Sequence, residues 1–580
     1  MSTKHFFHDS EALVLDCLES LTITNTFLAL DKANKSVFYT DHDSAKQVAL
    51  ISGGGAGHEP AHAGYVGDGL LTAAVSGSIF ASPNVSQILN TISRVGGEAG
   101  TILIIKNYTG DVFHFHLAAE KARAKYGLKV EIIIVRDDVS VGRQKSGKVG
   151  RRGLAGTVLV HKILGAMSKS PDASLEKLVS MGRLAASNLV TVGASLGHVH
   201  VPGRAAPDAT TLPPDQIELG MGIHNESGSR VLNPPPDAKT LIAMMLDQLL
   251  STTDSDRSYV DMRDAEEIVL LINNLGGISV LEMGGITKAV VSALGARKIS
   301  LSRVFSGTFM SSLDGPGFSI TLLKANSEML KHLDAPSNAV GWPSTEGLLS
   351  LRRDRSSQAS QASKFEADAD GSQDGAKMDV NDFKARVTRA CRNLIESEAR
   401  ITEADTIVGD GDCGITLARG ANAVMSYIDN SELSPVAAST LLGISNVIEE
   451  SMDGTSGALY SIFFNALASA LRSNPSTSQL GTSEWSAVTS SALAKLQAAT
   501  PARQGDRTLM DALEPFVNSF AKGDGAEAAF EQAKKGVEAT KGMQAAFGRA
   551  VYVEESAWSQ VPDPGAEGIL CILEGLVKKP

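Results

Sequence analysis

The chain has 580 residues, more than one hydrophobic core usually organises, which indicates two or more domains. Its 43% hydrophobic and 20% charged residues are ordinary for a globular protein, and the net charge of -12, with no basic stripe, disfavours nucleic acid as the principal partner. The sequence has no apolar run of about 20 residues and no apolar signal region, so we expect a cytoplasmic protein without a membrane segment. Its 4 cysteines are scattered, so we expect no disulfide framework and no zinc site.

The first part of the chain alternates strand-like and helical runs. Residues 1 to about 45 are predicted to form a helical lead-in with a variable loop. Strands are predicted at Val48–Ile51, Thr101–Ile105 and Val130–Val135, with a helix at Phe115–Tyr126. This alternation predicts a parallel α/β sheet up to about residue 190, and ligands of such sheets bind at the carboxyl ends of the strands.

A second α/β unit is predicted from Leu189 to about residue 335. Its strand-like runs are Ile268–Ile272 and Phe318–Leu323, and its helical runs include Thr240–Leu250 and Lys288–Leu294. We therefore predict a first domain at residues 1–336, made of subdomains at about 1–190 and 191–336.

The character of the chain changes after this domain. Residues 352–377 are rich in Ser, Gln, Ala and Asp and predict a flexible linker, within a boundary region at 337–379. From residue 380 to 580 helical periodicity dominates without a convincing strand, which predicts an all-α domain of seven or eight helices. The predicted helical segments are Asp382–Ser397, Ile415–Ile428, Pro435–Glu449, Ala458–Ala470, Ala487–Ala498, Thr508–Ala521 and Ala526–Thr540.

Three segments of the first domain bring together residue types suited to a small ligand. Val48–Pro60 contains four glycines that leave backbone N–H groups exposed, and His58 stands at the end of this turn. Lys106 and Asp111 follow a strand, so we expect both on the loop at its carboxyl end, beside the glycine loop if the strands are neighbours. Gly220–Gly228 flanks His224 with glycines. Taken singly, each segment is more often a packing turn, a solvated ion pair or a histidine without function.

One further segment imitates a phosphate-binding loop. Gly142–Val149 nearly matches G-x-x-x-x-G-K-[ST], but Val149 lacks the hydroxyl that such loops place on Mg²⁺. We do not expect nucleotide binding there.

The helical half carries the stronger nucleotide signal. Asp405, Asp410 and Asp412 are spaced by five and two residues with glycines between, which would let the backbone bring the acids to one point that suits Mg²⁺. Gly454–Gly457, at the start of a helix, offers hydroxyl and N–H groups to phosphate. Gly505–Asp511, Gly548-Arg549 and Asp563–Ala566 would complete a pocket, although each alone is more often a cap or a turn.

Five motifs in order carry a resemblance to a known family. They are Gly-Gly-Gly-Ala-Gly-His-Glu-Pro-Ala-His-Ala-Gly, Lys-Asn-Tyr-Thr-Gly-Asp, Gly-Arg-Arg-Gly-Leu-Ala-Gly-Thr, Gly-Met-Gly-Ile-His and Gly-Asp-Gly-Asp-Cys-Gly. Over essentially its whole length the chain resembles the ATP-dependent dihydroxyacetone kinases, the triokinase family of the single-chain type. The resemblance implies an α/β substrate domain followed by an all-α nucleotide domain, a barrel of eight antiparallel helices.

The resemblance also implies residue roles. His224 would add to the substrate carbonyl as a covalent hemiaminal, with Asp111 and His58 assisting. The implied substrate-binding residues are Gly55, Ala56, Gly57, His58, Lys106 and Asp111, and the implied Mg²⁺ ligands are Asp405, Asp410 and Asp412. The residues implied to bind ATP are Asp412, Cys413, Gly414, Thr455, Ser456, Thr508, Leu509, Arg549, Asp563, Pro564 and Gly565.

Three functions remain open at this point. The leading one is transfer of the γ-phosphoryl group of ATP to dihydroxyacetone or glyceraldehyde. The second, which some animal members of the family perform, is cleavage of FAD to AMP and a cyclic riboflavin phosphate. The third is a triose-binding regulator that has lost catalysis, which the intact acidic triplet disfavours.

The resemblance implies a homodimer, and a flexible linker of about 26 residues would span ~25 to 30 Å, enough for active sites formed between chains.

Overall fold

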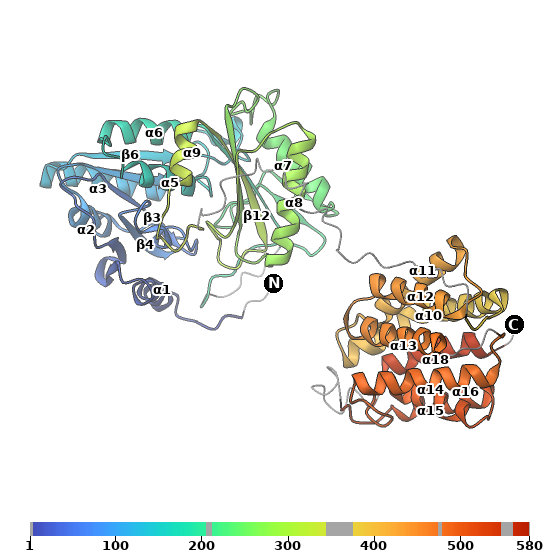
Figure 1. Cartoon of the computed structure of the whole chain (residues 1–580). Coiled ribbons are helices and arrows are strands. Elements are labelled where there is room, and N and C mark those ends of the chain that lie inside the picture. Colours follow the sequence, from blue (N-terminus) through green and yellow to red (C-terminus); the bar gives the residue numbers. More distant parts are fainter. Residues whose placement is uncertain are drawn as a thin grey trace. The chain divides into compact units, whose positions relative to one another are not determined.

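The computed structural model describes residues 4–204, 212–343, 375–473, 478–546, 559 and 561–578 (Figure 1). The chain divides into two compact units, Met1–Gln361 and Ala362–Pro580. The first is α/β and the second is all-helical, which confirms the predicted fold class. Most of the predicted linker, from residue 344 to 374, lies outside the described residues.

A six-stranded sheet forms the first half of the α/β unit, in the order β1-β2-β4-β3-β5-β6. The strands β4, β3, β5 and β6 pair in parallel, and β1 and β2 form an antiparallel edge. The bounds are β1 (Leu28–Asp31), β2 (Ser36–Tyr39), β3 (Ala49–Ala56), β4 (Ala73–Ile79), β5 (Thr101–Lys106) and β6 (Val130–Val135).

The predictions for this sheet are partly right. The parallel strands β3, β5 and β6 are confirmed, but β1 and β2 occupy the segment predicted as a variable loop, because four residues are too few to show a strand period. The predicted end of the first parallel strand at Ile51 is also wrong. β3 continues through Gly53 and Gly54, which stay paired with β4, and the register shifts before Ala56.

Helices cover both faces of this sheet. Alternate strand residues point to opposite faces, so Ile51 and Leu103 pack with α2 and α3, whereas Leu50 and Ile102 pack with α5 and α6. The bounds are α1 (Ser10–Thr24), α2 (Val85–Val95), α3 (Thr109–Tyr126), α4 (Arg143–Ser146), α5 (Thr157–Met167) and α6 (Leu175–Ser187).

The second sheet has the order β11-β10-β12-β7-β8-β9 and is antiparallel except for the pair β10 and β11. The helices α7 and α8 pack on one face, as Figure 1 shows beside β12. The bounds are β7 (Leu189–Ser195), β8 (Ile217–Leu219), β9 (Arg230–Leu232), α7 (Ala238–Leu250), β10 (Glu267–Asn274), α8 (Val280–Ala296), β11 (Arg303–Gly307), β12 (Gly317–Ala325) and α9 (Ser327–Asp334).

One hydrophobic core joins the two sheets. Residues of β3 and β5, such as Leu50 and Ile104, belong to the same buried cluster as Leu271 of β10 and Leu323 of β12. Helices α5, α6 and α9 contribute the side chains in between. The two sheets are therefore fixed to each other by packing.

The second unit confirms the helical prediction, with one helix missed. α18 lies at the carboxyl end, where no helical segment was predicted, and α10 runs 29 residues to Val408, well past the predicted end at Ser397. Helices in the described residues are α10 (Val380–Val408), α11 (Cys413–Asn430), α12 (Ala437–Ser451), α13 (Gly454–Arg472), α14 (Thr482–Ala499), α15 (Met510–Ala521), α16 (Ala526–Ala539) and α18 (Pro564–Val577). The antiparallel barrel stays a prediction.

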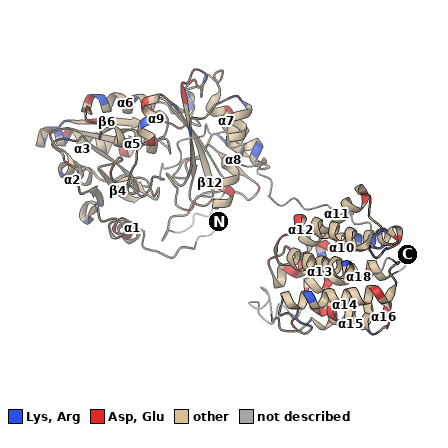
Figure 2. Ribbon diagram, in the orientation of Figure 1, with Lys and Arg blue, Asp and Glu red and all other residues tan. Residues whose placement is uncertain are grey.

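Charges are interspersed along both units. Figure 2 shows basic and acidic residues scattered over the ribbon of each unit. Within the described parts of the chain, every helix is too short or too polar to cross a bilayer.

Candidate active site

The end of β3 and the end of β5 place the first group of predicted residues together. The two strands are parallel neighbours, so the glycine loop lies beside Lys106, the last residue of β5. Asp111 lies in the first turn of α3 and not on the predicted loop, because that helix already begins at Thr109. A Cβ on Gly54 would lie 3.4 Å from Asp111 Oδ2 and 3.7 Å from Lys106 Cε, so glycine leaves space beside both charged groups.

His58 and His224 meet although they lie in different halves of the unit. Their Nε2 atoms are 2.9 Å apart, a distance at which one nitrogen must donate to the other. On the outer side, His58 Nδ1 donates to the Ser311 carbonyl at 2.9 Å and His224 Nδ1 donates to the Glu226 carboxylate at 2.8 Å. Both Nδ1 atoms therefore carry hydrogen, and the pair holds one proton more than two neutral rings.

The surroundings decide where this extra proton lies. Burial, with the nearby charges of Lys106 and His224, holds the pKa of His58 well below its ordinary value. Burial would raise the pKa of Glu226, but the hydrogen bond and charge of His224, and the charge of Arg152, lower it to about 2. The ionised Glu226 carboxylate opposite Nδ1 favours His224 as the donor and His58 as the acceptor between the two Nε2 atoms.

The turn that holds His224 also aims Glu226 back at it. Asn225 has a positive φ of 64°, a conformation that asparagine tolerates better than most residues. Its amide group accepts from Val199 N at 2.9 Å and donates to Val199 O at 3.0 Å, which fixes the turn. Glu226 Oε2 then accepts the backbone N–H of His224 at 2.9 Å.

Lys106 and Asp111 form a buried charged pair beside the histidines. Burial lowers the pKa of Lys106, although Asp111 and Glu226 act in the opposite direction. Burial likewise raises the pKa of Asp111, against the lowering effects of Lys106 and of the hydrogen bond from Ser82. Among the described residues the Lys106 ammonium meets no hydrogen-bond acceptor, and it lies 5.3 Å from the ring centroid of Tyr108. Its N–H groups are available to a ligand.

Two aromatic rings enclose His224. The ring centroids of Tyr108 and Phe80 lie 4.7 and 5.2 Å from that of His224. A Cβ on Gly55 would lie 2.8 Å from Phe80 Cα, and one on Gly57 would lie 2.8 Å from Phe80 Cε1. These two glycines therefore make room for Phe80.

The remaining predicted substrate residue and several unpredicted ones complete this site. Ala56 is buried, and it pairs with Ile79 of β4. Sequence reasoning assigned no role to Glu226, Phe80, Tyr108, Ser82 or Ser311. Only Glu226 carried a signal, as an acid two residues after the histidine within the same glycine-rich turn.

The acidic triplet of the helical unit converges as predicted. Carboxylate oxygens of Asp405, Asp410 and Asp412 all lie within 4.8 Å of one another. Asp405 is in the last turn of α10, and its Oδ2 accepts the N–H of Asp412 at 2.9 Å and of Cys413 at 3.0 Å. Gly411 has a φ of +76°, which turns the chain between the two exposed acids. Three clustered carboxylates are a donor set that fits Mg²⁺.

Other predicted nucleotide residues border this cluster. Cys413 and Gly414 are the first two residues of α11. Thr455 and Ser456 lie in the first turn of α13, and Ser456 forms a hydrogen bond with the Cys413 thiol. Burial raises the pKa of that thiol to about 12, helped by the charges of Asp405 and Asp563.

The segment that begins α18 lies against the segment before α15. A Cβ on Gly565 would lie 3.5 Å from Leu509 Cβ, and Thr508 N donates to Asp511 at 2.8 Å. Asp563 caps α18, where Pro564 is the first residue, and accepts from Ala566 N at 2.8 Å. Burial raises the pKa of Asp563 to about 7. Arg549 lies outside the described residues.

Comparison with known proteins finds two matching domain families. Residues 19–341 match the Dak1 domain and residues 407–578 match the DAK2 domain. The chain is 44% identical over 604 residues to the dihydroxyacetone kinase of Komagataella pastoris, and the match covers 99% of this chain and 98% of that protein. It is 38% identical over 591 residues to the triokinase/FMN cyclase of Mus musculus, covering 100% and 99% of the two chains.

A solved structure is similar over the same length. The dihydroxyacetone kinase from C. freundii in complex with AMP-PNP and Mg²⁺ is 32% identical, with a TM-score of 0.64, and the match covers 99% of each chain.

Proposed function

We propose that this chain, which belongs to the dihydroxyacetone kinase family, transfers the γ-phosphoryl group of ATP to a terminal hydroxyl of dihydroxyacetone, and also of glyceraldehyde. The observation that carries the proposal is the pairing of two sites in one chain. One unit holds a histidine pair suited to a small carbonyl compound, and the other holds three converging carboxylates.

The histidine pair supports covalent attachment of the triose. The shared proton first passes from His224 Nε2 to His58 Nε2, which frees the lone pair of His224. That lone pair forms a bond to the carbonyl carbon while the π pair moves to the oxygen, and His58 returns its proton to this oxygen. The product is a hemiaminal with a hydroxyl group, and the positive charge is again on His224, where Glu226 faces it.

Lys106 and Asp111 would act on the rest of the substrate. The N–H groups of Lys106 would bind a substrate oxygen. Asp111 is our candidate base for the attacking alcohol, because its burial raises the pKa of the carboxyl and makes its carboxylate a stronger base than an exposed one.

The helical unit would bind the nucleotide. Asp405, Asp410 and Asp412 would hold Mg²⁺, which neutralises charge on the phosphate oxygens of ATP. The N–H groups and hydroxyls of Thr455 and Ser456 at the start of α13 would contact phosphate. Catalysis then consists mainly of positioning, since phosphoryl transfer requires little covalent help from the protein.

A second activity, cleavage of FAD to AMP and a cyclic riboflavin phosphate, is favoured by the similarity to the triokinase/FMN cyclase. Product analysis separates the two. We expect purified protein with ATP and Mg²⁺ to convert dihydroxyacetone and glyceraldehyde to triose phosphates with stoichiometric ADP. Incubation with FAD and Mn²⁺ tests the second activity. If neither triose raises the rate of ADP production above the rate of ATP hydrolysis measured without triose, the kinase proposal is rejected and the triose-binding regulator remains.

The assembly is proposed to be a cytoplasmic homodimer whose active sites form between chains. Four free cysteines support a reducing compartment, and the location of the two sites in two separate units permits exchange between chains. We expect that mixing His224→Ala chains with Asp410→Ala chains restores activity, because some mixed dimers then hold one intact pair of sites. Each variant alone is the control. An inactive mixture despite subunit exchange, shown by mass spectrometry of differently tagged chains, would place both sites in one chain.

A further inference from the structure

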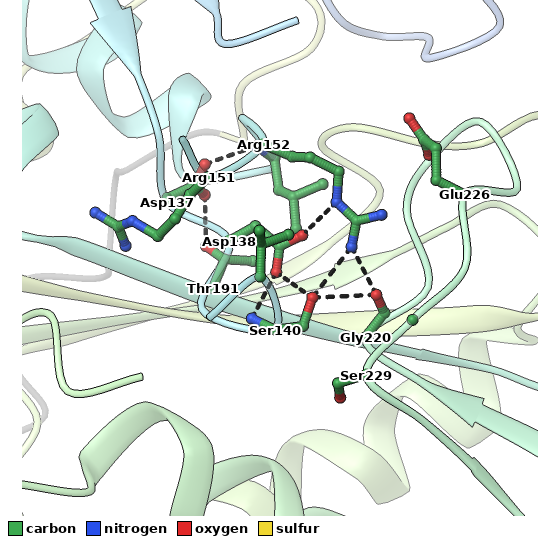
Figure 3. A network of polar contacts seen from close by, with 12 residues as sticks. Asp137, Asp138, Ser140, Arg151, Arg152, Thr191, Gly220, Glu226 and Ser229 are labelled. Atoms are coloured by element: carbon green, nitrogen blue, oxygen red, sulfur yellow. Dashed lines mark hydrogen bonds and ion pairs between the residues drawn. The ribbon is translucent and has the colours of Figure 1, made fainter. Parts of the chain in front are cut away.

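A buried polar network lies behind the turn that carries His224 (Figure 3). Its centre is Arg152, whose side chain is 14% exposed. Arg152 Nε donates to Asp138 Oδ2 at 2.8 Å, and Nη2 donates to the carbonyl of Gly220 at 2.7 Å and to Ser140 Oγ at 3.1 Å. The guanidinium therefore ties the segment after β6 to the first residue of the turn.

Asp138 and Ser140 keep this arginine in place. The Asp138 side chain is 1% exposed, and its Oδ1 accepts the backbone N–H of Ser140 at 2.9 Å and the Ser140 hydroxyl at 2.6 Å. A carboxylate that is already bound on one oxygen offers the other to Arg152 in a fixed direction. A lysine at position 152 would keep the charge but lose the planar fork that reaches several acceptors at once.

The remaining nitrogen of Arg152 faces Glu226. A Cβ on Gly222 would lie 2.5 Å from Arg152 Nη1 and 2.1 Å from Glu226 Oε2, so both groups converge on the space that this glycine leaves open. The positive charge of Arg152 favours the ionised form of Glu226. Glu226 is in turn the acceptor for both the ring Nδ1 and the backbone N–H of His224.

We propose that Arg152, fixed by Asp138, is a positioning residue that acts on His224 through Glu226. It holds the turn by the Gly220 carbonyl and keeps a carboxylate opposite Nδ1 of His224. This carboxylate fixes hydrogen on Nδ1 and directs the Nε2 lone pair to the substrate, and it stabilises the cation that the adduct places on His224. The inference rests on the proposed function and adds to it the residues that prepare the nucleophile.

Substitution of Arg152 in the full chain tests the kinetic consequence. We expect Arg152→Met to lower kcat/KM for dihydroxyacetone on the order of 100-fold, with the KM for ATP unchanged, since a prepared proton acceptor contributes about that much. Arg152→Lys should recover part of the loss by restoring the charge. The matched control is Arg151→Met, because the neighbouring Arg151 guanidinium lies over the Tyr259 ring at 3.9 Å and, among the described residues, makes no hydrogen bond to Asp138 or Gly220.

A second variant distinguishes a loss of positioning from a loss of folding. Gly222→Ala adds one methyl group whose close neighbours are the side-chain ends of Glu226 and Arg152, so it should displace the carboxylate without disturbing the backbone. We expect a similar loss in kcat/KM with an unchanged melting temperature. Kinetics of Arg152→Met and Gly222→Ala within about twofold of the wild type would overturn the proposal.

A spectroscopic readout separates this inference from the kinase proposal. In ¹⁵N-histidine spectra of the full chain at pH about 9, without triose or nucleotide, His224 should be protonated on Nδ1. The signal is assigned with His224→Gln. In Arg152→Met and Gly222→Ala the hydrogen should redistribute toward Nε2. An unchanged Nδ1 signal in both variants rejects the positioning role. Absence of triose phosphorylation by the wild type rejects only the proposed function, and the spectra still decide the positioning role.

Discussion

Asp410→Ala is expected to abolish triose phosphorylation while the first unit still binds dihydroxyacetone. Asp410 is one of two exposed carboxylates that converge with the buried Asp405, whose Oδ2 accepts the N–H groups of Asp412 and Cys413. Phosphoryl transfer depends on positioning and charge neutralisation, so loss of one central acid should lower turnover by at least about 1,000-fold. Coupled ADP release measures turnover, and calorimetric titration measures dihydroxyacetone binding.

A matched control is available in the same unit. Glu531 is exposed on α16, and Glu531→Ala removes the same charge without touching the triplet. This variant should keep full turnover. Near-normal activity of Asp410→Ala, or loss of triose binding in it, would show that the acidic triplet does not hold the catalytic metal.

The second large effect is expected at His224, the residue that we propose lets the enzyme distinguish trioses from glycerol. Dihydroxyacetone offers few atoms for affinity, and a hydrogen-bonding pocket alone would also accept glycerol, which has similar terminal hydroxyls. A nucleophile that requires a carbonyl removes this ambiguity. The wild type should therefore prefer dihydroxyacetone and glyceraldehyde over glycerol, and His224→Ala should lose most of its activity and of that preference.

Rates with dihydroxyacetone and glycerol for both proteins test this, together with a crystal structure of the wild type soaked with the ketone. His116→Ala serves as the control, because His116 is exposed on α3 and, among the described residues, its ring bonds a backbone carbonyl of its own helix. Equal use of glycerol by the wild type would contradict the prediction. So would clear density for unattached ketone beside His224.

Local sequence predicts the nucleotide side of the molecule better than the triose side. The three acids lie within eight residues, and the glycines between them already indicate a turn, so their convergence follows from local geometry. The parallel strands can also be predicted from local sequence, because β-branched runs bounded by glycine are visible there. The short edge strands β1 and β2 cannot be read from local sequence, since the pairing of β2 with β4, and of β1 with β2, makes them strands.

The triose side depends on tertiary contacts. His58 and His224 are 166 residues apart, and their hydrogen bond could be suspected only through family resemblance. Glu226 was visible as an acid near a histidine, but its direction depends on the positive φ of Asn225 and its hydrogen bonds to Val199. Arg152 belonged to a recognised motif, yet its partners come from two other segments, one after β6 and one at Gly220, so no spacing rule connects them.

The core shared by the two sheets has a consequence for the entropy of substrate capture. His58 follows a strand of the first sheet and His224 lies on a loop of the second, and the cluster that joins Leu50 to Leu271 prevents the sheets from moving apart. The two imidazoles are thus held at bonding distance before any ligand arrives. If the pair acts as proposed, a triose with few contacts need not supply free energy to order the two histidines, and its small binding energy is available for the transition state.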